Sequence, residues 1–206
     1  MAVDESVFIH PLALVESDTI GAGTRIWAFT HVMKGVPVGE SCNISDFVAV
    51  ETGAFIGNRV TIKPYVVVSN GVVIEDDAFI GPGVILPNDL APRSPRMAEM
   101  PEVTERYKAE SKWLKITRIG RGASLGTGAL IAPGLIIGDY AMVTMGAVVT
   151  KDVPPQRLVA GVPARGIGWA CLCGIPLERK DEGLWICPEC GRKYSQSGES
   201  IQLLDS

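Results

Sequence analysis

The sequence is poor in aromatic residues and in histidine, and it contains no long apolar run. Aromatic residues make up 6% of the 206 residues, and the two histidines are His10 and His31. No window approaches the roughly 20 apolar residues needed to cross a bilayer. The start of the chain contains no apolar stretch of the signal-peptide type. The sequence therefore predicts a cytoplasmic protein with no segment inserted in a membrane.

An excess of positive charge is also missing. The formal net charge is −4, so the chain has no overall basic footprint for nucleic acid. No glycine motif of the Walker or dinucleotide-binding type occurs, which leaves ATP and NAD binding without support. Glycine and proline, in contrast, are abundant, with 23 and 14 residues. With so few aromatics, this composition predicts many turns and a narrow core lined by aliphatic side chains.

A six-residue repeat runs through most of the chain. Stepping by six from Leu14 to Leu86 meets Leu, Ile or Val at all thirteen positions, and the repeat resumes from Ile119 to Val149. Four residues after most of these positions stands a small or branched residue, and glycine follows directly at 21, 39, 57 and 81. A period of six fits a short strand and a corner, with one aliphatic residue per side pointing inward.

Three such sides close a coil of about 18 residues, which predicts a parallel β-helix. The first run makes about four coils and the second about two. The 33-residue step from Leu86 to Ile119 is not a multiple of six, so a segment near 87–118 must leave the solenoid and return. A purely structural solenoid of the ice-binding type would need outward ladders of one small polar residue. The outward positions are mixed instead, with Glu51, Lys63 and Glu75 among them.

Four stretches give the chain a family resemblance. They are His10-Pro11, "RIWAFTHV" (25–32), "GPGVILPNDLAPRS" (81–94) and "GVPARGIGW" (161–169). With the repeat, they resemble the hexapeptide-repeat acyltransferases, and most of all the bacterial nucleotide-sugar N-acyltransferases. The resemblance implies an all-β fold, a left-handed parallel β-helix over residues 1–168 with one excursion loop. It also implies a homotrimer with active sites between subunits.

The implied reaction moves an acyl group, acetyl or longer, from acyl-CoA to the amine of a UDP- or dTDP-linked amino sugar, for surface polysaccharide biosynthesis. O-acetylating relatives generally use a histidine base, whereas a sugar amine is already a good nucleophile. The scarcity of histidine therefore favours N-acylation, and it weighs against a γ-type carbonic anhydrase, which needs three zinc-binding histidines. Two alternatives stay open: O-acylation of a sugar or small alcohol, and a non-catalytic solenoid with a docking module.

The family's motifs place two candidate catalytic residues. Asn88 follows Pro87 where the resembling enzymes have a Thr-Asn pair, and its amide can donate to a developing oxyanion or orient the amine. The alternative is a turn asparagine at the exit of the solenoid. His31 ends the "RIW-x-F-x-H" stretch and either orients substrate or is a surface imidazole, while Ala28 replaces a histidine often found there.

Three further residues are candidates for binding the sugar nucleotide: Arg93, Asp89 and Asn70. Arg93 belongs to an element like the family's Asn-Pro-Arg, where it either contacts the nucleotide diphosphate or forms a salt bridge within the loop.

The late repeat is suited to coenzyme A. The small outward residues Gly126, Ala132 and Gly146 would let the pantetheine arm lie against backbone groups. Lys151 and Arg165 follow this groove, where the adenosine phosphates need cations, and arginine can grip a phosphate with two hydrogen bonds. The alternative for both cations is a solvated surface charge.

The composition changes after residue 168. Cys171, Cys173, Cys187 and Cys190 have the spacing C-x-C-x13-C-x2-C, with glycine after each pair. Four thiolates in two such turns can hold a tetrahedral structural zinc, so residues 169–206 are predicted to form a zinc-ribbon-like module. The first pair is one residue tighter than the usual C-x2-C, and disulfides or free thiols are the alternatives. Cys42 falls on a small inward position of the repeat and is expected in the core.

Overall fold

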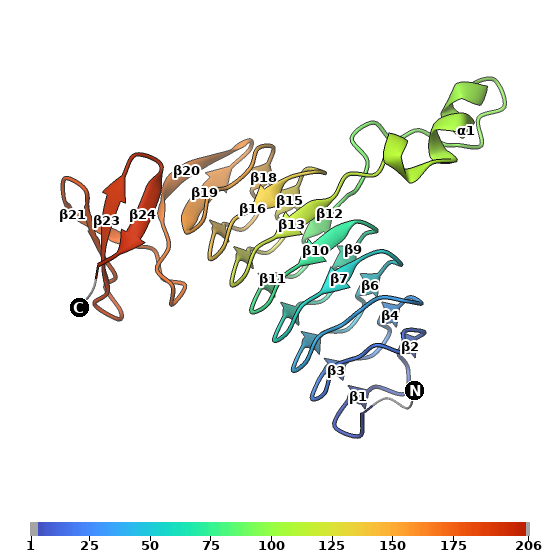
Figure 1. Cartoon of the computed structure of the whole chain (residues 1–206), viewed down its shortest axis with the longest axis horizontal. Coiled ribbons are helices and arrows are strands. Elements are labelled where there is room, and N and C mark those ends of the chain that lie inside the picture. Colours follow the sequence, from blue (N-terminus) through green and yellow to red (C-terminus); the bar gives the residue numbers. More distant parts are fainter. Residues whose placement is uncertain (1–3, 205–206) are drawn as a thin grey trace.

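The computed structural model describes residues 4–204, and in it the six-residue repeat winds into a parallel β-helix with three sides (Figure 1). Most strands have only two residues, because a corner follows each of them. The first side is a nine-stranded sheet of β1 (Phe8–Ile9), β3 (Arg25–Ile26), β5 (Asn43–Ile44), β8 (Thr61–Ile62), β11 (Phe79–Ile80), β14 (Ser124–Leu125), β17 (Met142–Val143), β19 (Arg157–Gly161) and β20 (Ala164–Trp169).

The other two sides are parallel throughout. The second is a seven-stranded sheet of β2 (Leu14–Val15), β4 (His31–Val32), β6 (Ala49–Val50), β9 (Val67–Val68), β12 (Ile85–Leu86), β15 (Leu130–Ile131) and β18 (Val148–Val149). The third is a four-stranded sheet of β7 (Phe55–Ile56), β10 (Val72–Ile74), β13 (Thr117–Ile119) and β16 (Ile136–Ile137). The solenoid extends beyond the expected repeat at both ends, because β1 precedes it and β19 follows it.

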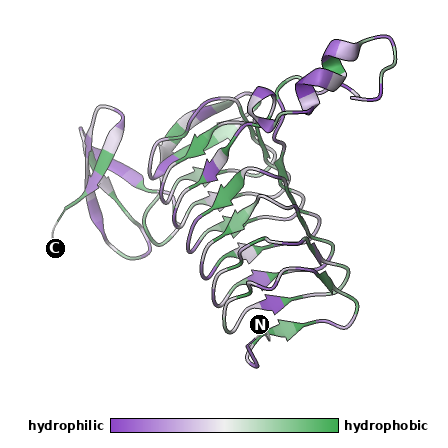
Figure 2. Cartoon of the chain, turned by 45° about the vertical axis from the view of Figure 1, so that its right-hand side comes forward, coloured by the Kyte–Doolittle hydropathy of each residue, from purple (hydrophilic) through white to green (hydrophobic). Residues whose placement is uncertain are grey.

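The strand register shows where the excursion enlarges a coil. Asn43 lies opposite Thr61, and Thr61 lies opposite Phe79 at the same spacing along the chain. Phe79, however, lies opposite Ser124, so this coil is more than twice as long as its neighbours. The extra chain leaves after β12 and returns at β13. It carries the helix α1 (Pro101–Tyr107) and the 3-10 turn η1 (Glu110–Lys112), and it projects from the side of the solenoid (Figure 2).

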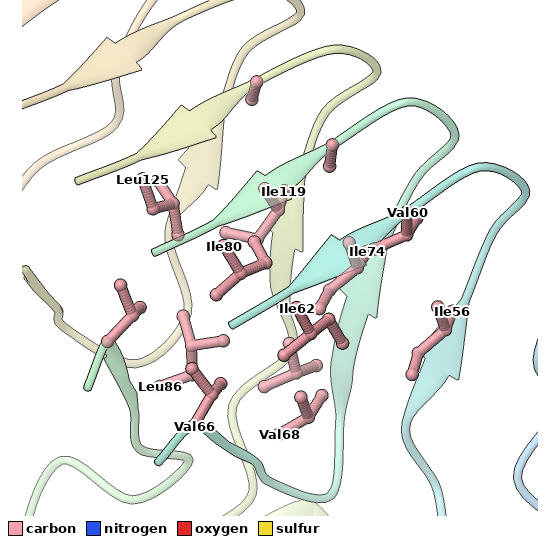
Figure 3. Close-up of a cluster of buried hydrophobic side chains, with 14 of the residues drawn as sticks. Ile56, Val60, Ile62, Val66, Val68, Ile74, Ile80, Leu86, Ile119 and Leu125 are labelled. Carbon is pink, nitrogen blue, oxygen red and sulfur yellow. The ribbon is translucent and has the colours of Figure 1, made fainter. Parts of the chain in front are cut away.

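The core is a column of aliphatic side chains inside the coils (Figure 3). Every repeat position from Ile20 to Val149 is buried, and Cys42 is buried among them as predicted. Leu14 is the exception, with 56% of its surface exposed. Val15, which pairs with Val32, packs against the core instead. The first coil is one residue shorter than the others, so the six-residue count from Leu14 is wrong for this strand.

Close stacking of the coils explains the glycines that follow the repeat positions. A Cβ atom on Gly39 would lie 2.5 Å from the carbonyl carbon of Gly57 in the next coil. A Cβ on Gly81 would lie 2.7 Å from the carbonyl oxygen of Leu125. These glycines are therefore required by the contact between coils.

The solenoid ends at β20, which runs antiparallel to β19. Beyond it, four antiparallel strands form a separate sheet: β21 (Glu178–Asp181), β22 (Leu184–Ile186), β23 (Lys193–Ser197) and β24 (Ser200–Leu203). We call residues 169–204 the cysteine module. Its own buried cluster contains Trp169, Cys171, Leu177, Cys187, Tyr194 and Ile201. Among the described residues, no helix combines the length and the apolar character that a membrane span requires.

Candidate active site

Asn88 lies two residues after the end of β12, at the point where the chain leaves the solenoid. Its side-chain Nδ2 donates to the carbonyl oxygen of Asn70 at 3.1 Å, and its own carbonyl accepts from the amide of Lys115 at 2.9 Å. Within residues 4–204, no hydrogen bond engages the second N–H of this amide or its Oδ1 atom. Asn88 thus ties the exit of the loop to Asn70 with one N–H group, and within the described residues the other N–H group forms no hydrogen bond.

Asn70 occupies the corner before β10 and connects three parts of the structure. Its backbone amide donates to the Glu51 carboxylate at 2.9 Å, and its Nδ2 donates to Oε1 of Glu110 in η1 at 2.9 Å. A Cβ atom on Gly53 would lie only 2.1 Å from Oδ1 of Asn70, so the glycine gives this side chain its room. Asn70 therefore ties the returning end of the loop to the corner from which Asn88 is held.

Asp89 is engaged by the loop itself. Its carboxylate accepts hydrogen bonds from the Tyr107 hydroxyl and from the amide of Ala91. Burial acts to raise the pKa of Asp89, but these two hydrogen bonds hold it below its ordinary value. The amide of Arg93 donates to the same Tyr107 hydroxyl at 3.1 Å. In the described part of the chain the Arg93 guanidinium forms no ion pair, so the alternative of a loop salt bridge is not found within one chain.

His31 lies on β4, and its Nε2 atom is 2.8 Å from the carboxylate of Glu16. On the seven-stranded side, β4, β6, β9 and β12 are successive neighbours. At about 4.8 Å between strands, His31 is roughly 14 Å from the strand that precedes Asn88. A single chain therefore does not bring the two candidate catalytic residues together.

A cavity of about 460 Å³ lies beside the last coils of the solenoid. It is lined by Val149, Lys151, Asp152, Val153, Pro154, Arg157, Val159, Ala164, Arg165, Gly166 and Glu199. Lys151 and Arg165, the two predicted phosphate-binding cations, share this cavity. The three predicted small residues of the pantetheine groove are not part of its lining.

The structure gives a local reason for glycine at Gly126 and at Gly146, but none for a small residue at Ala132. A Cβ atom on Gly126 would lie 2.4 Å from the amide nitrogen of Met145 in the next coil. Gly146 has φ +66°, and a Cβ atom there would meet nothing within 4 Å. Ala132 is half-buried, and its amide donates to the carbonyl of Val149 at 2.9 Å. Their role toward coenzyme A stays a prediction.

Arg157 is a third cation of the cavity, and sequence reasoning missed it. Its guanidinium carbon lies 4.6 Å from the ring centroid of Trp169, and a Cβ atom on Gly166 would lie 2.4 Å from its Nε atom. The pairing of β19 with β20 places Arg157 opposite Trp169. This antiparallel pair is not part of the six-residue repeat, so the repeat carries no signal for it.

The four cysteine sulfurs of the module form one cluster, all within 4.8 Å of one another. Sγ of Cys171 is 3.5 Å from that of Cys190, and Sγ of Cys173 is 3.6 Å from that of Cys187. A disulfide has sulfurs about 2.05 Å apart, so these thiols are not paired. Thiolates about 2.3 Å from a tetrahedral zinc lie roughly 3.8 Å from one another. The cluster therefore has the size and the soft donors that zinc requires.

Comparisons with known proteins agree with the solenoid fold. The family model described as bacterial transferase hexapeptide (six repeats) matches residues 53–88, and the model described as hexapeptide repeat of succinyl-transferase matches residues 116–151. Among solved structures, the UDP-N-acetylglucosamine acyltransferase from Campylobacter jejuni is similar in fold. Its TM-score is 0.57 at 13% identity, over 80% of this chain and 68% of that one.

A similar fold occurs in the acetyltransferase domain of PglB from Neisseria gonorrhoeae in complex with acetyl coenzyme A. The TM-score is 0.51 at 22% identity, over 79% of this chain and 58% of that chain. The dTDP-3-amino-3,6-dideoxy-alpha-D-galactopyranose 3-N-acetyltransferase of Aneurinibacillus thermoaerophilus is far more similar in sequence. It is 49% identical over 200 residues, which are 97% of this chain and 96% of that relative.

This chain belongs to the hexapeptide-repeat nucleotide-sugar acyltransferases. The acyltransferase has the expected left-handed β-helix fold. It transfers an acyl group from acyl-CoA to the amine of a nucleotide-linked amino sugar, which confirms the reaction class predicted from the sequence.

Proposed function

We propose that this acyltransferase acetylates the 3-amino group of a dTDP-linked 3-amino-3,6-dideoxyhexose. The observation that carries the proposal is the 49% identity to the 3-N-acetyltransferase over 97% of this chain. The galactoside O-acetyltransferase of Escherichia coli, by contrast, matches only 24% of the chain. Similarity over the whole length includes the loop and the cysteine module, whereas the shorter match spans only part of the chain.

The reaction requires little from the protein beyond the positioning of the amine and the thioester. A neutral sugar amine attacks the thioester carbonyl, the C–N bond forms and the C–S bond breaks, and the amine's proton is passed to the departing thiolate. The second N–H of Asn88 donates to the oxygen that gains negative charge in this step. No strong base is needed, because holding amine and thioester together supplies a large part of the rate.

Coenzyme A would occupy the cavity beside the last coils. Lys151 and Arg165 both line it, and their charges would hold the phosphate groups of the donor. The pantetheine arm would continue along the coils past Gly126, Ala132 and Gly146. The sugar nucleotide would bind at the loop exit, with Asn70, Asp89 and Arg93 nearby.

The active site would be completed in a homotrimer. Because His31 lies roughly 14 Å from the strand before Asn88, the two side chains could serve one amine only if they came from different chains. A ladder of exposed aromatic rings on one edge of the solenoid supports a contact between copies. Phe29, Phe47 and Tyr65 are 56%, 47% and 67% exposed, and their stacked ring centroids lie 5.0 and 5.2 Å apart.

The cysteine cluster would hold one structural zinc ion per chain. All four protein donors are thiols, so no coordination position stays open for a substrate. The zinc would contribute to the folding of the module and not to the acyl transfer.

A thiol-release assay tests the proposed reaction. Acetyl-CoA is offered with dTDP-3-amino, dTDP-4-amino and UDP-amino sugars, and with the hydroxyl counterparts of each. The expected result is fastest turnover on the dTDP-3-amino sugar and none on the hydroxyl sugars. Turnover restricted to hydroxyl sugars would contradict N-acylation, and a clear preference for UDP or for another amine position would contradict the assigned substrate.

A further inference from the structure

The cysteine module reaches the cavity that we assign to coenzyme A. Of the residues lining this cavity, Glu199 stands on the turn between β23 and β24, and the others belong to the last coils and to β19 and β20. One residue of the cavity lining thus comes from a part of the chain that carries none of the hexapeptide repeat.

A second connection runs through Arg157. Its guanidinium lies over the ring of Trp169, with the carbon 4.6 Å from the centroid. Such a contact is favourable because the face of an indole ring attracts a cation. Gly166 leaves open the space that the guanidinium fills, since a Cβ atom there would be 2.4 Å from both Nε and Nη2. The side chain is therefore held in one orientation at the wall of the cavity.

Trp169 itself is held by the module. Its side chain is fully buried in the cluster that contains Cys171, Cys187 and Tyr194. The Tyr194 hydroxyl lies 3.1 Å from the Cys171 sulfur, which links the aromatic part of this cluster to the cysteines. The position of the indole ring therefore depends on the packing around Cys171 and Cys187.

We propose that the cysteine module positions Arg157 as a third phosphate-binding cation of the coenzyme A site. Trp169 is the positioning residue, and the inference rests on the proposed placement of the donor in this cavity. An arginine that is already held in place loses less side-chain entropy when it binds a phosphate, and its planar fork can make two hydrogen bonds. Zinc in the module would then support donor affinity although it lies outside the reaction.

Isothermal titration of the full-length protein with coenzyme A tests the assignment of Arg157. Arg157→Ala should weaken binding by about tenfold or more, the effect of losing about 1.4 kcal/mol from a charge-assisted contact. Arg157→Lys should restore part of the affinity, because it keeps the charge without the planar stack. Arg179→Ala is the matched control, since Arg179 is exposed on β21 and outside the cavity lining.

A double-mutant cycle tests the coupling to the module. Cys187→Ser should weaken coenzyme A binding in the parent protein and should add little in the Arg157→Ala background, because both changes remove the same contact. Trp169→Phe keeps an aromatic face and should retain most of the affinity, whereas Trp169→Leu should not. Thermal unfolding and far-ultraviolet circular dichroism show whether the solenoid of each variant stays folded. Full additivity of Cys187→Ser and Arg157→Ala would overturn the coupling.

Two further variants separate this inference from the placement of the donor. If Lys151→Ala and Arg165→Ala weaken coenzyme A binding while Arg157→Ala and Cys187→Ser leave it unchanged, the placement stands and the inference is wrong. If all four variants bind coenzyme A like the parent, the donor lies elsewhere and both proposals are wrong.

Discussion

Individual positions in this chain require glycine for two different reasons. Gly126 lies so close to the next coil that a Cβ atom would be 2.4 Å from a backbone nitrogen, whereas Gly146 faces open space but has φ +66°. The first reason is contact between coils, and the second is backbone conformation. Identical substitutions at the two positions should therefore have different costs.

Gly126→Ala should destabilise the protein much more than Gly146→Ala. A positive φ costs an alanine about 1–2 kcal/mol, which corresponds to a fall in Tm of about 3–6 °C for a chain of this length. Gly126→Ala forces two coils apart, and we expect a fall of about 10 °C or more. Differential scanning calorimetry of the two variants measures the difference. Equal falls in Tm would contradict the assignment of Gly126 to the coil contact.

Asn88→Ala should lower kcat by roughly 10²-fold, the order seen when one oxyanion donor is removed. The Kd for coenzyme A should change little, because Asn88 is outside the donor cavity. The variant also loses the hydrogen bond to Asn70, which costs about 1 kcal/mol of stability. Steady-state kinetics combined with a thermal melt separates the two effects. A loss confined to KM would make Asn88 a substrate-binding residue, and parent-like kinetics would leave it only its structural role.

At the scale of the elements, a ladder of polar side chains caps the corners of successive coils. The Oδ1 atom of Asn58 accepts a hydrogen bond from the amide of Glu40 at 2.9 Å, and Oδ1 of Asp76 accepts one from the amide of Asn58 at 2.8 Å. In both cases the donating amide belongs to the preceding coil. The amide of Asn58 holds the pKa of Asp76 below its ordinary value, and hydrogen bonding from Arg59 lowers the pKa of Asp77. Both carboxylates therefore stabilise the solenoid in their ionised form.

Acid should remove this stabilisation. A carboxyl group whose pKa is lower in the folded state stabilises the fold above its unfolded-state pKa, and the effect is lost as the pH falls through the folded-state value. Asp77→Asn should thus lower the Tm at pH 7 and lower it less at pH 3. Asp181→Asn, a control on exposed β21, should leave the Tm unchanged at both pH values. Melting curves of the parent and both variants between pH 3 and 7 measure these differences. A difference in Tm between Asp77→Asn and the parent that does not change with pH would contradict the role of the Asp77 charge.

The cysteine module should contain about one zinc ion per chain, and Cys187→Ser should lose it. A closed thiolate site contributes folding free energy, so the variant should lose order in the module and keep a folded solenoid. Metal analysis of protein purified without chelator measures the zinc. Cys42→Ser is the control, because Cys42 lies in the solenoid core and should leave the zinc content unchanged. Parent protein that contains no zinc would contradict the assignment.

At the scale of the whole molecule, the exposed aromatic ladder and the separation of His31 from Asn88 both favour assembly. One chain has a mass of 22.0 kDa, and light scattering should give three times this mass for the proposed trimer. Phe47→Glu should lower the measured mass. Phe47 is the middle ring of the ladder, and a charge there would oppose its burial against another copy. Arg179→Glu, on the exposed β21, is the control and should leave the mass unchanged. A parent protein with the mass of a single chain in solution would contradict a site shared between chains.

The sequence by itself determined the solenoid and its core, because a six-residue step between inward side chains allows few other windings of the chain. It also located the excursion, the cluster of cysteines and the cation pair of Lys151 and Arg165. The one-residue slip at Leu14 was not predictable, since Leu14 and Val15 are both aliphatic and only strand pairing shows which one faces inward. The helix α1 within the loop was missed as well, because it lies outside the repeat.

Only the tertiary structure decided which separated segments meet. The antiparallel return of β20 places Trp169 over Arg157, and a turn of the module brings Glu199 to the cavity wall. Likewise, Asn70 holds both Asn88 and Glu110, which lie 18 and 40 residues away in the chain. A periodic pattern specifies how one coil packs on the next. Contacts made where the period ends depend on how the chain turns there, and the sequence pattern has no repeat from which to read them.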